Sequence, residues 1–147
     1  MAGNFLRRNT RQRKVILDEL RKLTSHPTAV ELYEFARRRL PKISLGTVYR
    51  NLEILTLEGT IRRLDSVGAE ARFDGDITEH HHVRCVRCGA VGDVRGLPGL
   101  PGEMTVTDTS QLGGYEILGY RLQFEGICPL CRDAQDAADG NADAEAG

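Results

Sequence analysis

The sequence lacks tryptophan altogether, and aromatic residues make up only 5% of its 147 residues. A chain of this composition is ordinary for a soluble protein but has few large side chains from which to build an extensive core. It also lacks any apolar run near the roughly 20 residues that a membrane-spanning helix requires. Its first fifteen residues, MAGNFLRRNTRQRKV, lack the apolar stretch of a secretory signal peptide. We therefore expect a cytoplasmic protein with no membrane partner.

The chain carries almost no net charge, since its formal charge is −1, but the two signs are unevenly distributed. Residues 1–73 contain 15 Lys/Arg and 8 Asp/Glu, a net of +7, whereas residues 74–147 contain 5 and 13, a net of −8. A basic half followed by an acidic half indicates a module that binds a polyanion, joined to a module of another kind. Two solvated halves that attract each other are the alternative explanation.

Apolar residues at helical spacing predict three short helices in the basic half. The first covers about residues 10–23, the second begins at the capping box Thr28-x-x-Glu31, and the third covers about residues 45–57. Residues 61–73 then alternate as a two-stranded hairpin would. Three helices and a β-ribbon in this order are typical of a winged helix-turn-helix, in which the third helix reads the major groove of DNA.

Several side chains of the basic half suit contacts with DNA. Arg and Asn offer bidentate patterns that match base edges, whereas Tyr and Thr suit phosphates and the thymine methyl group. The predicted contact residues are Arg11, Thr47, Tyr49, Arg50, Asn51 and Arg62. Those on the third helix are expected to face outward. A helical module that binds another protein is the alternative.

The acidic half is expected to consist of short strands and turns. Residues 82–85 alternate as a strand, residues 88–94 suit a knuckle turn and a returning strand, and residues 115–126 suit two short strands. Residues 103–112 remain ambiguous, because their Thr and Val content weakens a helix prediction. The tail from residue 132 is expected to be a frayed helix followed by disorder.

The four cysteines occur as two Cys-x-x-Cys pairs separated by thirty-nine residues. Each pair directs two thiolates at one point, and four thiolates complete a tetrahedral structural zinc site. A dithiol redox couple needs only one pair, and a [4Fe–4S] cluster usually has denser cysteine spacing, but both remain alternatives. In a reducing cytosol metal thiolates are favoured over disulfides. A half so poor in aromatic residues is not expected to fold without this zinc. The predicted ligands are Cys85, Cys88, Cys128 and Cys131.

Three consecutive histidines, His80, His81 and His82, lie between Asp74 and Asp93. On a strand, His80 and His82 project to one face and His81 to the other. Nitrogen and oxygen donors of this borderline hardness suit Fe(II), Mn(II), Zn(II) or Ni(II) and argue against Ca(II). The residues alone leave the choice among these metals open.

The chain contains the stretches HPTAVELYEFAR, PKISLGTVYRNLEIL, RFD, HHHVRCVRCGAVGDV and GICPLC. Together they resemble the ferric uptake regulator family of bacterial metalloregulators, over about residues 7–132. Members of that family are homodimeric repressors in which an N-terminal winged helix precedes a small α/β dimerisation domain. The resemblance therefore implies an α/β (α+β) chain with a DNA-binding domain over residues 1–72 and a metal-binding dimerisation domain over residues 73–132. Composition predicts an acidic, disordered tail over residues 133–147.

The resemblance also implies two metal sites, a structural Zn(II) held by the four cysteines and a regulatory Fe(II) or Mn(II) between the domains. By itself, His26 would be interpreted as a helix-capping or surface histidine. The resemblance makes it the ligand that the DNA-binding domain contributes. The implied regulatory ligands are His26, Asp74, His80, His82 and Asp93.

Within that family, iron-sensing members usually carry glutamate where this chain has Asp74, whereas peroxide-sensing members have aspartate there and at the position of Asp93. The resemblance thus implies a dimer that binds double-stranded operator DNA and releases it after peroxide reacts at bound Fe(II). The histidines implied as sensitive to oxidation are His26 and His80. Mn(II) in the same site would give a repressor that is insensitive to peroxide.

A second site of many iron-sensing members has histidine where this chain has Tyr120 and aspartate where it has His81. This departure also favours the peroxide-sensing class. The alternative is an iron- or zinc-level-sensing repressor of metal uptake genes. A zinc hydrolase is disfavoured, because no Glu lies within the histidine run as a base and no substrate-pocket motif is present. The protein is therefore not expected to be an enzyme, and peroxide is expected only as a signal. A zinc ribbon that only binds proteins would leave the basic half without a role.

Overall fold

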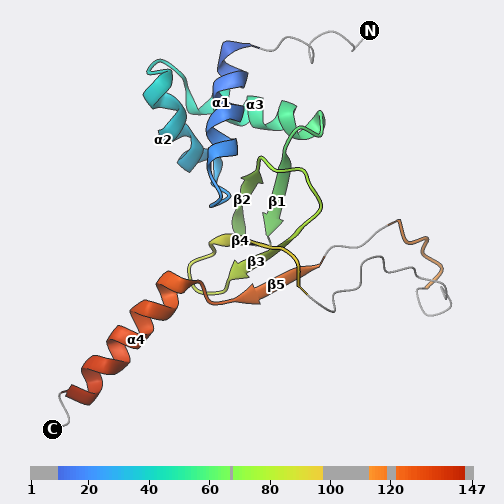
Figure 1. Ribbon diagram of the computed structural model, residues 1–147. Coiled ribbons are helices and arrows are strands. Elements are labelled where there is room, and N and C mark those ends of the chain that lie inside the picture. The colour runs from blue at the N-terminus through green and yellow to red at the C-terminus, as the bar shows by residue number, and fades with distance from the viewer. Residues whose placement is uncertain (1–9, 67, 98–112, 119–121, 145–147) are drawn as a thin grey trace.

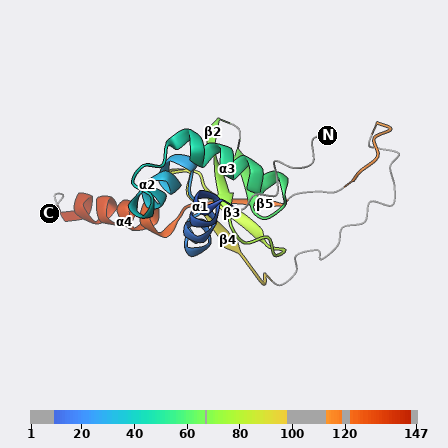
Figure 2. The same ribbon diagram turned by 90° about the horizontal axis from the view of Figure 1, so that it is seen from above.

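The computed structural model describes residues 10–66, 68–97, 113–118 and 122–144. Three helices lie above a two-stranded hairpin, a second small sheet lies below the hairpin, and α4 projects away from both (Figure 1). Seen from above, α4 and residues 113–118 extend to opposite sides (Figure 2). The elements are α1 (Arg11–Lys22), α2 (Ala29–Arg39), α3 (Leu45–Leu57), β1 (Arg62–Ser66), β2 (Ala69–Asp74), β3 (His81–Cys85), β4 (Val91–Val94), β5 (Gln123–Gly126) and α4 (Pro129–Ala144).

Each of the first three helices begins at a side-chain cap. The Thr10 hydroxyl accepts a hydrogen bond from the backbone N–H of Arg13 at 3.2 Å, and the Ser44 hydroxyl accepts from that of Thr47 at 3.1 Å. Thr28 and Glu31 form the predicted capping box in full. These caps satisfy backbone donors that the first helical turn leaves unpaired, so the helix starts follow from local sequence. The predicted α+β fold with a winged helix-turn-helix is confirmed.

The core of the basic half is almost entirely aliphatic. Its helices and the hairpin bury a single cluster in which Phe73 of β2 is the one fully buried aromatic residue. The side chains of this cluster with relative exposure of at most 2% include Ile16, Leu20, Leu32, Val48, Leu52, Leu55 and Ile61. Because β2 packs into this cluster, the wing is anchored to the helices rather than hinged on them.

The second sheet belongs to the acidic half and has the strand order β4-β3-β5. β3 pairs antiparallel with β4, where His82 lies opposite Asp93, and parallel with β5, where Val83 lies beside Phe124. Among residues 76–97, 113–118 and 122–140, Cys85 is the only buried apolar residue. A half with so little apolar burial needs another source of stability.

Two elements differ from the sequence-based expectations. Of the described residues in the range 115–126, only those of β5 form a strand, and residues 115–118 do not. The tail predicted as a frayed helix followed by disorder is helical to Ala144, because Pro at the first helical position and a run rich in Ala favour a helix. Residues 103–112 and 119–121, with Tyr120, lie outside the described residues. Of the described helices, none combines the length and apolar character of a membrane-spanning segment.

Candidate metal centres and nucleic-acid interface

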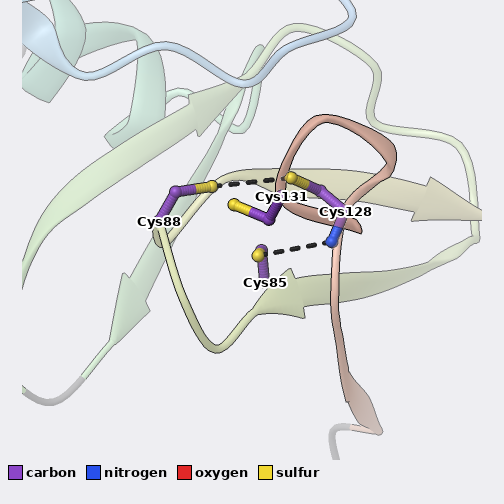
Figure 3. Close-up of side chains that lie close together, drawn as sticks. All are labelled: Cys85, Cys88, Cys128 and Cys131. Carbon is purple, nitrogen blue, oxygen red and sulfur yellow. Dashed lines mark hydrogen bonds between the residues drawn. The ribbon is translucent and has the colours of Figure 1, made fainter. Parts of the chain in front are cut away.

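The four cysteines converge from three places in the chain. Cys85 ends β3, Cys88 lies in the turn after it, and Cys128 and Cys131 flank the start of α4 (Figure 3). Their four Sγ atoms lie within 4.8 Å of one another, and the Cys88 and Cys128 sulfurs are 3.7 Å apart. A tetrahedral zinc with Zn–S bonds of about 2.3 Å spaces its sulfurs by about 3.8 Å. The cluster therefore fits one zinc ion, and it leaves no ligand position open for a substrate.

The thiols in this cluster affect one another's ionisation. Backbone N–H groups of Cys88 and Cys128 lower the pKa of Cys85 to about 6, and the Cys128 N–H lies 3.3 Å from the Cys85 sulfur. The neighbouring sulfurs of Cys128 and Cys88 raise the pKa of Cys131 to about 12. Four thiolates this close together repel one another unless a cation lies among them. A divalent ion among the four sulfurs removes that repulsion. A redox couple at a single Cys-x-x-Cys pair would not explain why all four sulfurs converge.

Three histidines and two aspartates from both halves of the chain meet where β2 ends and β3 begins. Asp93 Oδ1 lies 2.7 Å from His26 Nε2 and 3.0 Å from His80 Nε2. Asp74 Oδ2 lies 2.9 Å from His80 Nε2 and 3.0 Å from His82 Nε2. The structure thus brings together all five residues of the implied regulatory set, in an arrangement of nitrogen and oxygen donors that suits Fe(II), Mn(II) or Zn(II).

The backbone sets the tautomer of His80. Its Nδ1 lies 2.7 Å from the carbonyl oxygen of Thr78, which can only accept, so Nδ1 carries the proton. In the neutral ring, Nε2 then directs its lone pair at the two carboxylates. His81 lies on the other face, with its ring centroid 6.4 Å from that of Phe124, as strand alternation predicts. Lone pairs facing carboxylate oxygens are favourable only with a cation or a proton between them.

His26 connects this cluster to helices α1 and α2. It lies between α1 and α2 with φ of 48°, a left-handed conformation that costs a non-glycine residue about 1–2 kcal/mol. Arg72 donates to the His26 carbonyl at 3.0 Å, and the Phe73 N–H donates to the Pro27 carbonyl at 3.0 Å, so the wing holds this turn in place. The His26 side chain is 2% exposed, and its Nδ1 has no hydrogen-bond partner among the described residues. A bound cation would satisfy this buried site.

Both carboxylates of the cluster are held in the anionic form. Burial would raise the pKa of Asp74, but hydrogen bonds from His82 and from the Asp76 N–H hold it below its usual range. The pKa of Asp93 is likewise lowered by its contact with His26, in spite of partial burial.

Gly75 follows Asp74 because a Cβ there would lie 3.2 Å from the α carbon of Arg21 at the end of α1. The residue that follows β2 thus packs directly on α1.

Four of the predicted DNA-contact residues lie at the surface. Arg11 and Arg50 are exposed, Tyr49 is 48% exposed, and Thr47 is partly exposed. Arg11 lies in the first turn of α1, and the other three lie in the first half of α3. This placement is compatible with insertion of the N-terminal part of α3 into a DNA groove.

Two other predicted contact residues are engaged within the protein. Asn51 is 4% exposed, so the expectation that it faces outward is wrong. Its Oδ1 accepts from Arg13 Nε at 3.2 Å and its Nδ2 donates to the Thr47 carbonyl at 2.8 Å, because it lies on the face of α3 that packs against α1. Arg62 lies at the base of the wing and donates to the Ile77 carbonyl at 2.7 Å.

Sequence reasoning missed Arg13, which is 7% exposed and links α1 to α3. A signal was present, since Arg13 falls on the same helical stripe as Ile16 and Leu20. An arginine on an apolar stripe requires a buried acceptor, and Asn51 supplies one.

Replacement of Asn51 by alanine is expected to lower the free energy of unfolding by roughly 1–3 kcal/mol, because Arg13 loses a buried acceptor. Urea denaturation followed by circular dichroism measures this change. Glu53→Ala, at an exposed position of the same helix, is the matched control and should change the unfolding free energy by less than about 0.5 kcal/mol. Equal midpoints for both variants would mean that the Arg13–Asn51 contact contributes nothing to stability.

Comparison with known proteins is consistent with these two clusters. The Ferric uptake regulator family profile matches residues 6–98. The peroxide operon regulator of Bacillus subtilis (strain 168) is 32% identical over 124 residues, which cover 84% of this chain and 83% of that protein.

Two solved structures have the same fold. A zinc-bound manganese uptake regulator superposes with a TM-score of 0.59 at 26% identity, covering 82% of this chain and 90% of that one. The peroxide stress regulator of Campylobacter jejuni superposes with a TM-score of 0.59 at 25% identity, covering 82% of this chain and 88% of that one. The chain therefore belongs to the ferric uptake regulator family and is a metal-responsive transcription regulator rather than an enzyme.

Proposed function

We propose that this protein is a dimeric repressor that binds double-stranded operator DNA while Fe(II) or Mn(II) is bound between its two halves. Peroxide oxidation of the Fe(II)-bound protein then releases the DNA. The observation that carries the proposal is the cluster of three histidines and two aspartates at the junction of the halves. The ligands would be His26, Asp74, His80, His82 and Asp93, and Zn(II) at the four cysteines would stabilise the acidic half.

The proposed domain boundary falls at the end of β2, near Phe73 and Asp74. Phe73 packs in the helical core, whereas Asp74, the next residue, faces the histidines. On this basis the DNA-binding domain covers about residues 1–72 and the dimerisation domain about residues 73–132, in a cytoplasmic protein. The predicted tail, residues 133–147, consists of most of α4 and the residues after it.

Metal can control DNA affinity only if it binds the closed arrangement of the domains more tightly than the open one. Moving such an equilibrium from mostly open to mostly closed takes on the order of 3–5 kcal/mol. His26 comes from the turn between α1 and α2, whereas His80, His82 and Asp93 belong to the other half. A ligand set divided in this way is complete only in the closed arrangement, so metal binding and domain closure are coupled.

Asp74 supports the peroxide-sensing class, as does the similarity to the Bacillus subtilis peroxide operon regulator. Bound Fe(II) would supply the reactivity with peroxide, and the net change would be transfer of one oxygen atom from peroxide to an imidazole carbon, leaving water. The His26 and His80 side chains are 2% and 1% exposed, so peroxide in solution has little direct access to them. An oxidised imidazole is a poorer donor, and oxidation of His26 would weaken the link to the DNA-binding helices.

The test uses the full-length zinc protein, loaded anaerobically with either Fe(II) or Mn(II). Duplex DNA selected from a random library by the Mn(II) form serves as the operator probe. We expect stoichiometric hydrogen peroxide to abolish binding of the Fe(II) form only. Tandem mass spectrometry should find one added oxygen on His26 or His80. His81, which lies on the other face of β3, is the internal control and should remain unmodified.

Unchanged binding with unmodified histidines would refute the peroxide mechanism. It would leave a repressor that responds to iron or zinc level at the same site.

Binding to DNA should also weaken steeply with salt concentration, since the basic half carries a net charge of +7 over residues 1–73.

A further inference from the structure

Arg95, the residue after β4, joins a group of polar side chains beside the regulatory cluster. Its Nη2 donates to Asp76 Oδ2 at 2.6 Å and to Asp93 Oδ2 at 3.3 Å, and its Nη1 donates to Thr78 Oγ1 at 3.4 Å. Asp76 Oδ1 accepts from the Thr78 N–H at 2.9 Å and from the Thr78 hydroxyl at 2.6 Å. We call Asp76, Thr78 and Arg95 the brace. Its members come from the β2–β3 loop and from the end of β4, so it joins two segments that carry ligands.

The brace contacts three of the five candidate ligands. A backbone N–H of the brace donates to Asp74 Oδ1 at 2.8 Å. A backbone carbonyl of the brace accepts from His80 Nδ1 at 2.7 Å. Its guanidinium donates to Asp93 Oδ2 at 3.3 Å. Partners of this kind orient metal ligands and fix their tautomers.

The effect of these contacts on ligand orientation is clearest for the two carboxylates. Asp74 Oδ1 accepts from the brace at 2.8 Å and lies 3.6 Å from His26 Nδ1, while its Oδ2 lies within 3.0 Å of His80 and His82. Asp93 Oδ2 is engaged by the brace, while its Oδ1 lies 2.7 Å from His26. We propose that the brace orients both carboxylates so that Asp74 Oδ2 and Asp93 Oδ1 are directed at the histidines, and that Arg95 and Asp76 are positioning residues that set the affinity of the regulatory site for a divalent metal. This inference rests on the proposed regulatory site.

The brace is not positioned to stabilise the fold. The Arg95 and Asp76 side chains are 47% and 44% exposed, and ion pairs this exposed contribute little to folding stability. Their main effect is therefore expected on the orientation of Asp93 and of the β2–β3 loop.

The charges of Arg95 and Asp76 determine which variant separates an effect on ligand orientation from an effect on electrostatic attraction. Removal of Arg95 alone would leave the Asp76 carboxylate unpaired near the metal, and the added attraction would oppose the loss of orientation. Removal of both residues deletes one charge of each sign and leaves the net charge unchanged. A change in metal affinity in the double variant therefore reports on orientation.

The experiment measures Mn(II) affinity of the full-length zinc protein by competition with a chelator of known affinity. Asp76→Ala/Arg95→Ala is expected to bind Mn(II) about 10–100-fold more weakly than the unmodified protein. The matched control is Glu34→Ala/Arg37→Ala, which removes an ion pair of α2 whose side chains are 54% and 52% exposed. This control should bind Mn(II) as tightly as the unmodified protein. Asp76→Asn/Arg95→Gln repeats the test with little change in side-chain shape.

Zinc content and the thermal midpoint of the Mn(II)-free protein should be unchanged, while the electron paramagnetic resonance spectrum of bound Mn(II) should change in the double variant. Undiminished affinity in the double variant overturns the proposal. A loss of affinity that comes with loss of zinc or with a lower midpoint also overturns it, because the pair would then be a structural contact. Failure of the unmodified protein to bind Mn(II) would instead refute the proposed regulatory site.

Discussion

Replacement of His26 by alanine is expected to abolish metal-dependent binding to operator DNA while the zinc content and the fold remain unchanged. His26 is the imidazole that the helical part of the DNA-binding half contributes to the cluster, and it lies 2.7 Å from Asp93 across the junction. Without it, metal can still bind the acidic half but no longer distinguishes the closed from the open arrangement. If the coupling is about 3–5 kcal/mol, operator affinity in the presence of Mn(II) should fall at least about 100-fold.

Fluorescence anisotropy with the selected duplex measures this loss. Because His26 has a positive φ, His26→Asn is a useful second variant, since asparagine tolerates that backbone conformation better than alanine does. His81→Ala is the matched control and should retain full response to Mn(II), as His81 faces away from the cluster. Metal-dependent binding by either His26 variant would show that the junction site has been assigned incorrectly.

Replacement of Cys131 by serine is expected to cost the protein its zinc and the structure of its acidic half. The free energy of zinc binding at structural sites, about 10–16 kcal/mol in zinc-finger peptides, is comparable with or larger than the net stability of a whole domain. Among residues 76–97, 113–118 and 122–140, Cys85 is the only buried apolar residue, so apolar packing supplies little to replace the zinc. The basic half has its own core and should remain folded.

Elemental analysis for zinc and hydrogen exchange by mass spectrometry provide the readouts. Amides of β3, β4 and β5 should lose protection, while those of α1 to α3 keep theirs. Gln135→Ala is the control, because it removes a hydrogen bond from Arg87 beside the cluster without removing a sulfur. Retained protection of β3 in a zinc-free protein would mean that the metal is dispensable for folding.

Much of the fold follows from residues close together in the chain. The caps at Thr10, Thr28 and Ser44 start the helices where the sequence predicts, since capping depends on residues only three positions away. The alternation that puts His81 on the opposite face from its neighbours is equally local. The convergence of the four cysteines on one site is predictable as well, because two Cys-x-x-Cys turns can satisfy one tetrahedral ion. The sequence predicts only a frayed helix at the start of the tail, whereas α4 runs to Ala144; its extent was not predicted because this composition suits both a helix and disorder.

The meeting of distant side chains depends on packing and is decided only in three dimensions. His26 and Asp93 are 67 positions apart, and nothing in the local pattern around His26 indicates a ligand; the resemblance to the family suggested it, and the folded chain brings the two together. Asn51 faces inward because Arg13, 38 positions away, occupies the adjoining face of α1. Arg95 reaches Asp76 because β3 and β4 pair in the register that sets His82 opposite Asp93. Caps, strand alternation and cysteine spacing are written in short stretches of sequence, whereas these contacts require the register of the sheet and the packing of helices to be known first.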